Sequence, residues 1–311
     1  MTSKLVMRGM IGFYILLFFL YLFGPLAVMS ITAFNTPAYP QAYPFQAFTL
    51  DWFVKLWNHR AMMDGLRNSF IIGIGVVAVS VPVGLAASIV MTQIYHRARG
   101  FYYLVTVSPV LTPGVIIGIS TVIFWKDVLG VTDFTKAVFY KGIVLAILGQ
   151  SSFVAAYCLL IIMARLQRFD RSQEEAALDL GASYPQVFWH ILLPFLKPAL
   201  ISAAVIAFLS SFENYNTTTF AILADKTLVT VLAGEVRQGT TPALSALAVI
   251  IIGISLAGAI AYEVMKRREE AASGRAMERA RLAERADAVP AQQAPGPMGF
   301  SGRTPAPASA D

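Results

Sequence analysis

Cysteine, histidine and charged residues are all scarce in this sequence. Cys158 is the only cysteine among 311 residues, so neither an intrachain disulfide nor a cysteine metal cluster can form. The three histidines, His59, His96 and His190, are scattered without the paired spacing of metal ligands. Neither a nucleophile elbow nor a G-x-x-x-x-G-K-S/T phosphate loop occurs. These absences predict a protein that is not an enzyme and that holds no metal or cofactor of its own.

Apolar residues, by contrast, make up 57% of the chain, charged residues only 14%, and the mean hydropathy is +0.63. These values lie outside the range of ordinary soluble domains. The net charge of +6 does not indicate a nucleic-acid partner, because the Lys and Arg residues lie between long apolar runs and form no continuous basic face. The composition therefore predicts a protein embedded in a lipid bilayer.

Six stretches of the sequence are long and apolar enough to cross a membrane, which takes about 20 residues without unpaired charge. Five contain no acidic or basic residue, and the sixth, between Lys197 and Asp225, contains only Glu213. We predict an all-α integral membrane protein with six transmembrane helices and a cytoplasmic helix pair. The transmembrane helices are expected near residues 10–33, 68–92, 102–125, 142–164, 199–221 and 242–264.

The charges between these helices favour a cytoplasmic N-terminus, because most Lys and Arg residues then lie in inside segments, as the positive-inside rule requires. Six spans place both termini in the cytosol. The predicted organisation is a short cytoplasmic segment at 1–9, a membrane domain at 10–265 and a charged, then Pro- and Ala-rich, cytoplasmic tail at 266–311.

The polar segment 165–198, between the fourth and fifth predicted spans, has the local signals of two short helices. Ser172 and Glu175 have the spacing of a capping box, and Gly181 predicts a left-handed helix end. In the second helix, Pro185 suits the first turn. Ser183 can cap this helix, with Gln186 as its partner three residues later, and Pro194 should end it.

The same segment carries a family motif. Its residues are Glu175, Ala176, Ala177, Gly181, Ile191, Leu193 and Pro194. With this spacing the segment resembles the EAA loop of the inner-membrane permeases of ABC importers. The resemblance implies a type I importer fold, in which this loop is a coupling helix that enters a cleft of the ATPase. It also implies a bacterial inner-membrane location.

The partners that this resemblance implies are two ABC ATPase subunits, which bind the ATP, a second permease and an extracytoplasmic binding protein that delivers a small-molecule substrate. The second permease is expected to be a homologue. The runs Ser108–Gly114 and Ser210–Asn214 make the chain most similar to the second permease of spermidine/putrescine-type systems. That branch implies a polyamine or a related amine as cargo, although Asn214 follows Glu213 where a second carboxylate would stand.

Glu213, with Asn214 beside it, is a candidate for the substrate path, because an acidic residue within a span faces either a watery path or a partner group. The alternative for Glu213 is a plain interhelical hydrogen bond. On a continuous helix, Thr217 would lie one turn beyond Glu213 on the same face.

Pro109 and Pro113 should break the third span, and a kink there would line a path or serve packing alone. Gln150 in the fourth span is polar enough to line the path, or to bond a neighbouring helix.

Other classes of protein fit less well. A secondary transporter or channel subunit working without an ATPase would need coupling charges in several spans. A membrane enzyme would need a catalytic cluster. The helix pair at 165–198 could also lie on the membrane surface without any partner.

Overall fold

The computed structural model of the chain describes residues 2–129, 132–258, 260, 263, 264 and 267. Within this part of the chain the elements are helices, and the only strand-like pairing is a single bridge between Asn35 and Phe48. The described residues up to Val249 form one compact unit, and those from Ile250 onward are assigned to a second. The predicted all-α class is confirmed.

Four helical runs among the described residues are long and apolar enough to cross a membrane. They are α1 (Thr2–Ala33), α3 (Arg60–Gln93), α7 (Gly142–Leu166) and the run Tyr184–Phe212, which contains α10 (Leu193–Phe212). The first three cover the predicted spans at 10–33, 68–92 and 142–164. The total of six remains a prediction, because a bent pair and the shorter apolar helix Pro242–Gly258 supply the other two candidates.

The third predicted span, 102–125, is broken into two pieces. α4 (His96–Leu111) and the segment Gly114–Val128 are bent by 96° relative to each other. The second piece consists of α5 (Gly114–Thr121) and a wider π-helical stretch, η1 (Val122–Val128). The break falls at Pro113, which has no N–H to continue the helical hydrogen bonds. The predicted break is confirmed there, whereas Pro109 lies inside α4 without ending it.

The fifth predicted span, 199–221, is wrong at both ends. α10 starts earlier and ends at Phe212, and a separate short helix, α11 (Asn216–Ala221), follows. The physical reason for the early end is a new helix start, because Asn214 Oδ1 accepts hydrogen bonds from the amides of Thr217 and Thr218 at 3.1 and 3.2 Å. The sequence predicted that Thr217 would lie on the same helix face as Glu213. This prediction is wrong, because the two residues do not belong to one continuous helix.

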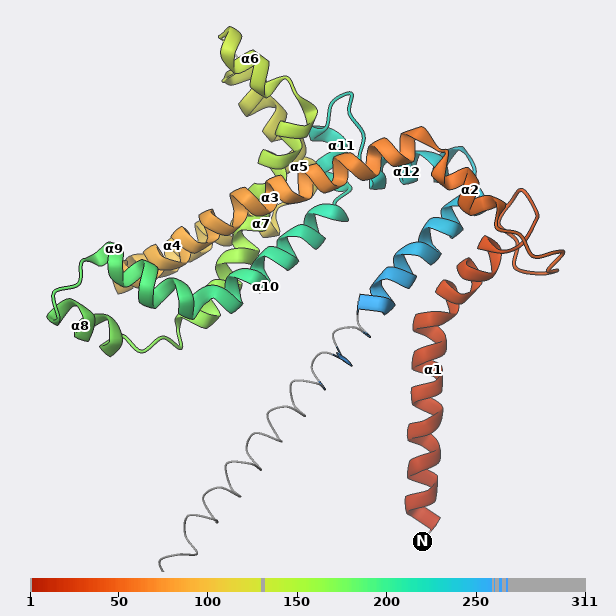
Figure 1. The fold of residues 1–311 in the computed structure, drawn as a ribbon, viewed down its shortest axis with the longest axis horizontal. Coiled ribbons are helices and arrows are strands. Elements are labelled where there is room, and N and C mark those ends of the chain that lie inside the picture. The colour runs from red at the N-terminus through yellow and green to blue at the C-terminus, as the bar shows by residue number, and fades with distance from the viewer. Residues whose placement is uncertain (1, 130–131, 259, 261–262, 265–266, 268–311) are drawn as a thin grey trace, which may run out of the picture. The chain divides into compact units, whose positions relative to one another are not determined.

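Three helices, α3, α7 and α10, pack side by side and form the main core (Figure 1). Small residues bring their backbones close together, which is how membrane helices associate. A Cβ added at Gly84 of α3 would lie 2.5 Å from the Cβ of Cys158 on α7. One at Gly73 would lie 2.8 Å from the ring of Phe208 on α10. Buried members of this core include Ile72, Val76, Val154, Ile162, Leu196 and Ala203.

A second buried cluster gathers the other end of α3 and the short helices near it. These are α2 (Asp51–Trp57) and α12 (Leu228–Gln238). Trp52 is buried there, and its indole N–H donates to the backbone oxygen of Asn35 at 2.7 Å. Met62, Leu228 and Leu247 complete the contacts. α3 thus contributes to both clusters, with Met62 near its start in the second and Ile72 and Val76 in the main core.

Candidate functional site

The first helix of the predicted loop is α8 (Ser172–Asp179), but it is not capped as the sequence predicted. Ser172 is its first residue rather than its cap, and no side-chain cap bond is made by the preceding Arg171. The carboxylate of Asp170 takes this role instead, because its Oδ1 accepts from the Ser172 amide at 3.0 Å. An Asp two residues before an amide forms this local bond readily.

Gly181 ends α8 as predicted. Its φ is +85°, a conformation that residues with a Cβ rarely adopt. The amide of Gly181 donates to the Leu178 oxygen at 2.9 Å, and that of Ala182 donates to the Ala177 oxygen at 3.0 Å. This pair of bonds is the Schellman arrangement. The glycine therefore sets the direction in which the chain leaves the helix.

The second helix of the loop starts as predicted but does not stop at Pro194. In α9 (Tyr184–Val187), Gln186 Oε1 accepts from the Ser183 amide at 2.8 Å, and Pro185 lies in the first turn. A π-helical stretch, η2 (Phe188–Leu192), then leads directly into α10. The wider winding lets the helix accept Pro194, which lacks an N–H, in the first turn of α10.

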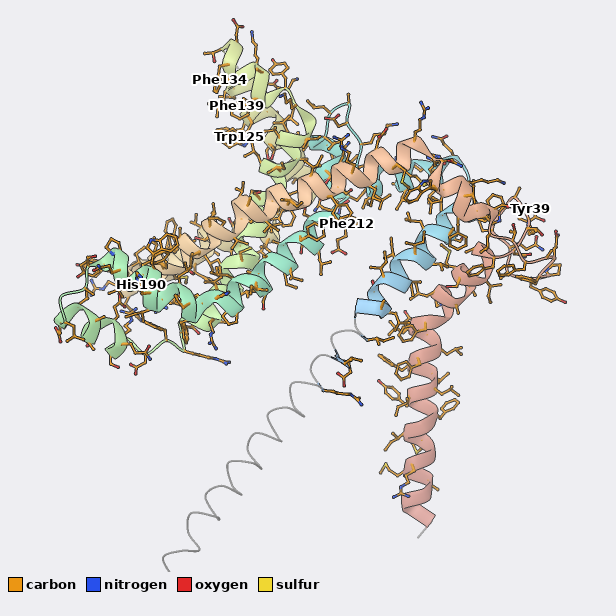
Figure 2. All side chains as sticks on the ribbon, viewed as in Figure 1. Tyr39, Trp125, Phe134, Phe139, His190 and Phe212 are labelled. Atoms are coloured by element: carbon orange, nitrogen blue, oxygen red, sulfur yellow. The ribbon has the colours of Figure 1, made fainter. Side chains whose placement is uncertain are left out.

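The surface of this loop is apolar at several places. Leu180 is 90% exposed, Tyr184 73% and Trp189 62%. Glu175 and Ala176 are exposed as well, and Ala177 is half-buried. A shallow hollow beside the elbow is lined by Leu180, Gly181, Ala182, Gln186, Val187, His190 and Ile191. His190 is labelled there in Figure 2.

Sequence reasoning missed Tyr184 and Trp189, although large aromatic residues in a polar loop were a usable signal. Of the remaining predicted residues, Ile191 and Leu193 are half-buried and Pro194 is exposed.

Two arginines attach the loop to the membrane helices. Arg165 Nε donates to the Phe195 oxygen at 3.4 Å, and the guanidinium lies 4.3 Å from the centre of the Phe195 ring. Phe169 packs on the same ring at 5.1 Å between centres. Arg171 Nη2 donates to the Thr92 oxygen of α3 at 3.4 Å. A cavity of about 240 Å³ lies beneath α8 beside Arg171, and Glu175 is among its lining residues.

Glu213 lies at the C-terminal cap of α10 and is exposed in the isolated chain. The carbonyl groups at a helix C-terminus carry partial negative charge, so a carboxylate there is unfavourable until a cation comes near. A positively charged group is therefore the chemical complement of this position. Figure 2 labels the neighbouring Phe212, the last residue of α10.

Gln150 is fully engaged with other helices. It is 1% exposed, its Nε2 donates to Thr218 Oγ1 at 2.7 Å, and its Oε1 accepts from the Ser211 hydroxyl. Asn214 also bonds the Thr218 hydroxyl, at 3.2 Å. Gln150 and Asn214 therefore hold the break between α10 and α11 together. Of the two possibilities for Gln150, the structure contains the interhelical bond.

The break at Pro113 lies against the break between α10 and α11. A Cβ on Gly114, next to Pro113, would lie 3.0 Å from Thr217 Oγ1. One turn later, a Cβ on Gly118 would lie 2.6 Å from the Thr217 oxygen. Within the described residues the buried Thr217 hydroxyl has no hydrogen-bond partner. The structure thus brings Pro113, Gln150 and Asn214 to one region, with Pro109 one turn earlier on α4.

Comparison with known proteins supports one family. Residues 80–270 match the family described as "Binding-protein-dependent transport system inner membrane component". The chain is 30% identical to the putrescine transport system permease protein PotI of Escherichia coli over 260 residues, which is 82% of this chain and 90% of PotI. It is 25% identical to the spermidine/putrescine transport system permease protein PotC of Haemophilus influenzae, over 80% of this chain and 93% of PotC.

The fold also matches a solved structure, that of a bacterial ABC transporter involved in the import of the acidic polysaccharide alginate. The TM-score is 0.63 at 17% identity, and the match covers 86% of this chain and 96% of that one.

Proposed function

We propose, from the premise that this chain belongs to the family of binding-protein-dependent transport system inner membrane components, that it forms part of the translocation path of an ABC importer for a small amine. The observation that carries the proposal is the loop 165–198, which lies inside the matched region and presents an exposed helix, elbow and helix. The family consists of transport permeases rather than enzymes. In the proposed importer, the ATP is bound by the partner ATPase subunits.

The proposed cargo is a polyamine or a related cation. Two relatives are named for putrescine or spermidine transport. Glu213 supports this choice, because its carboxylate at the negative end of α10 is complemented by a protonated amine. The proposed partners are two ATPases, a homologous second permease and an extracytoplasmic binding protein.

The proposed mechanism is alternating access driven by the ATPases. Their closure on ATP would displace α8 and α9. Because Tyr184–Phe212 is one continuous helical run, movement of α9 is carried along α10 to its far end. Glu213 caps that end, and the breaks near Pro113 and Asn214 lie together in one region. A helix that moves as a unit therefore connects the docking loop with the proposed path.

Reconstitution in liposomes with the partner ATPases and binding protein tests this function. We expect uptake of labelled putrescine that requires ATP and that stops when the phosphate-loop lysine of the ATPase is replaced by alanine. Uptake that continues without ATP hydrolysis would instead support a secondary transporter or channel.

The proposed topology has both termini in the cytosol, with 1–9 inside, a membrane domain at 10–265 and a cytoplasmic tail at 266–311. In a Cys158→Ala background, a membrane-impermeant thiol reagent should label Lys136→Cys from outside and Gln173→Cys only after permeabilisation. The reverse pattern would overturn the orientation.

A further inference from the structure

The N-terminal end of α8 is attached to the last turn of α3. The final four carbonyl groups of a helix have no partner within it, and Thr92 is in the last turn of α3. The guanidinium of Arg171 supplies one such partner, 3.4 Å from the Thr92 oxygen. A cation at a helix C-terminus also interacts favourably with the helix dipole. Arg171 thus joins two elements that are 79 residues apart in the sequence.

The other end of α3 is held just as closely to α12. Ser69 Oγ accepts from the Leu228 amide at 3.0 Å, and Asn68 Nδ2 donates to the Lys226 oxygen at 2.9 Å. A Cβ on Gly65 would lie 3.0 Å from the Leu228 amide nitrogen, so the two backbones touch. The N-cap residue of α3, His59, lies 3.5 Å from Glu235 of α12.

Between these attachments α3 is a single helix from Arg60 to Gln93, continuous through Pro82. Each turn of an α-helix is hydrogen-bonded to the next, so a displacement of one end is carried along the helix, with Pro82 as the place where it bends most readily. A displacement of α8 therefore reaches the membrane domain in two ways. One route is the covalent chain, which joins α8 to α7 and to α10, and the other is the bond of Arg171 to α3, which leads to α12.

We propose that Arg171 is a positioning residue that couples movement of α8 to α3, and through α3 to α12 at the opposite end of that helix. The proposal rests on the proposed function, since it assumes that an ATPase moves α8. It assigns the second route to one side chain, whose hydrogen bond is made to the Thr92 oxygen of α3.

Arg171→Met keeps an unbranched side chain, although a shorter one, and removes the hydrogen-bond donors and the charge. In the reconstituted importer we expect the variant to retain ATPase binding while the amount of cargo imported per ATP hydrolysed falls about fivefold, near the lower end of known couplings between sites. Arg171→Lys keeps the cation and should recover part of the loss. Arg168→Met is the matched control, because Arg168 is also an exposed arginine of this loop and makes no side-chain hydrogen bond within the described residues.

A distance measurement distinguishes an effect on the movement transmitted from α8 to α3 from an effect on docking of the ATPase. Spin labels at Gln93→Cys and Gln173→Cys, in a Cys158→Ala background, report whether α3 and α8 move together. We expect one narrow distance distribution with and without ATP in the otherwise unchanged chain, and a broadened one with Arg171→Met. An unchanged ratio of cargo to ATP in Arg171→Met would overturn the proposal, as would loss of ATPase binding, because Arg171 would then serve docking alone. Absence of ATP-dependent uptake in the unsubstituted complex would count against the proposed function itself.

Discussion

Gln150 of α7 and Thr218 of α11 are joined by a buried hydrogen bond of 2.7 Å, although one helix is a long span and the other a short segment after a break. The oxygen of the same amide, Gln150 Oε1, accepts a hydrogen bond from the Ser211 hydroxyl at the end of α10. One side chain thus bonds both sides of the break. The position of Glu213, which lies between them, depends on this amide.

Gln150→Leu should therefore destabilise the protein. The substitution leaves the Ser211 hydroxyl without its partner and removes one of the two hydrogen bonds of the Thr218 hydroxyl, which keeps its bond to Asn214, at a cost of about 1–3 kcal/mol. Thermal unfolding of the purified complex in detergent should occur at lower temperature, and uptake should fall. Ser152→Ala is a matched control on the same helix, because Ser152 is exposed, and it should change stability by less than about 0.5 kcal/mol. Equal melting temperatures for the two variants would show that the amide bonds are dispensable.

Gly181→Val should impair coupling without unfolding the spans. No atom lies within 4 Å of a Cβ at this position, so the penalty comes only from the backbone at φ +85°. A β-branched residue is strongly disfavoured there, whereas Asn is tolerated better. ATP hydrolysis stimulated by the binding protein should fall in Gly181→Val and be largely retained in Gly181→Asn. If the two variants behave alike, the left-handed elbow is not needed for coupling.

Ala177→Glu should weaken ATPase docking by a different mechanism. Ala177 is half-buried on α8, which the proposed function places against the ATPase, so a longer charged side chain would enter that contact. The cost is about 2 kcal/mol if the contact excludes water. Co-purification of the ATPase should decrease, while membrane insertion is unchanged. Gln173→Glu adds the same charge at an exposed position of α8 and should retain the ATPase. Full complex formation by Ala177→Glu would remove this residue from the interface.

Glu213→Gln tests the role of charge at the end of α10. The amide keeps the shape of the side chain but no longer offers a full negative charge to a cationic cargo. Uptake of putrescine should fall about tenfold, which corresponds to roughly 1.4 kcal/mol. Asp127→Asn removes a carboxylate whose surface pair with Lys126 contributes little, and it should transport normally. Unchanged uptake in Glu213→Gln at normal expression would make Glu213 a structural residue.

Local signals in the sequence predicted local structure well. Gly181 and the Ser183 to Gln186 spacing are features that act within one helical turn, and both were confirmed. The break after Phe212 was missed because the stretch between Lys197 and Asp225 contains only one charged residue, Glu213, and therefore suggested one continuous span. Asn214 was the available signal, since its side chain competes with the helix for backbone amides. The bond from Arg171 to Thr92 depends on how distant helices pack, which no local pattern records.

The wide turn of η2 has a consequence for orientation. The Leu193 amide bonds the Phe188 oxygen, five residues back, so this turn holds one residue more than an α-helical turn. Each residue of an α-helix corresponds to a rotation of about 100° about the axis. The side chains of Tyr184 and Val187 are therefore rotated by roughly that angle relative to α10, compared with an unbroken α-helix. One extra residue thus sets the direction, about the helix axis, in which the exposed aromatic side chains of the loop point. This direction is independent of how α10 packs in the core.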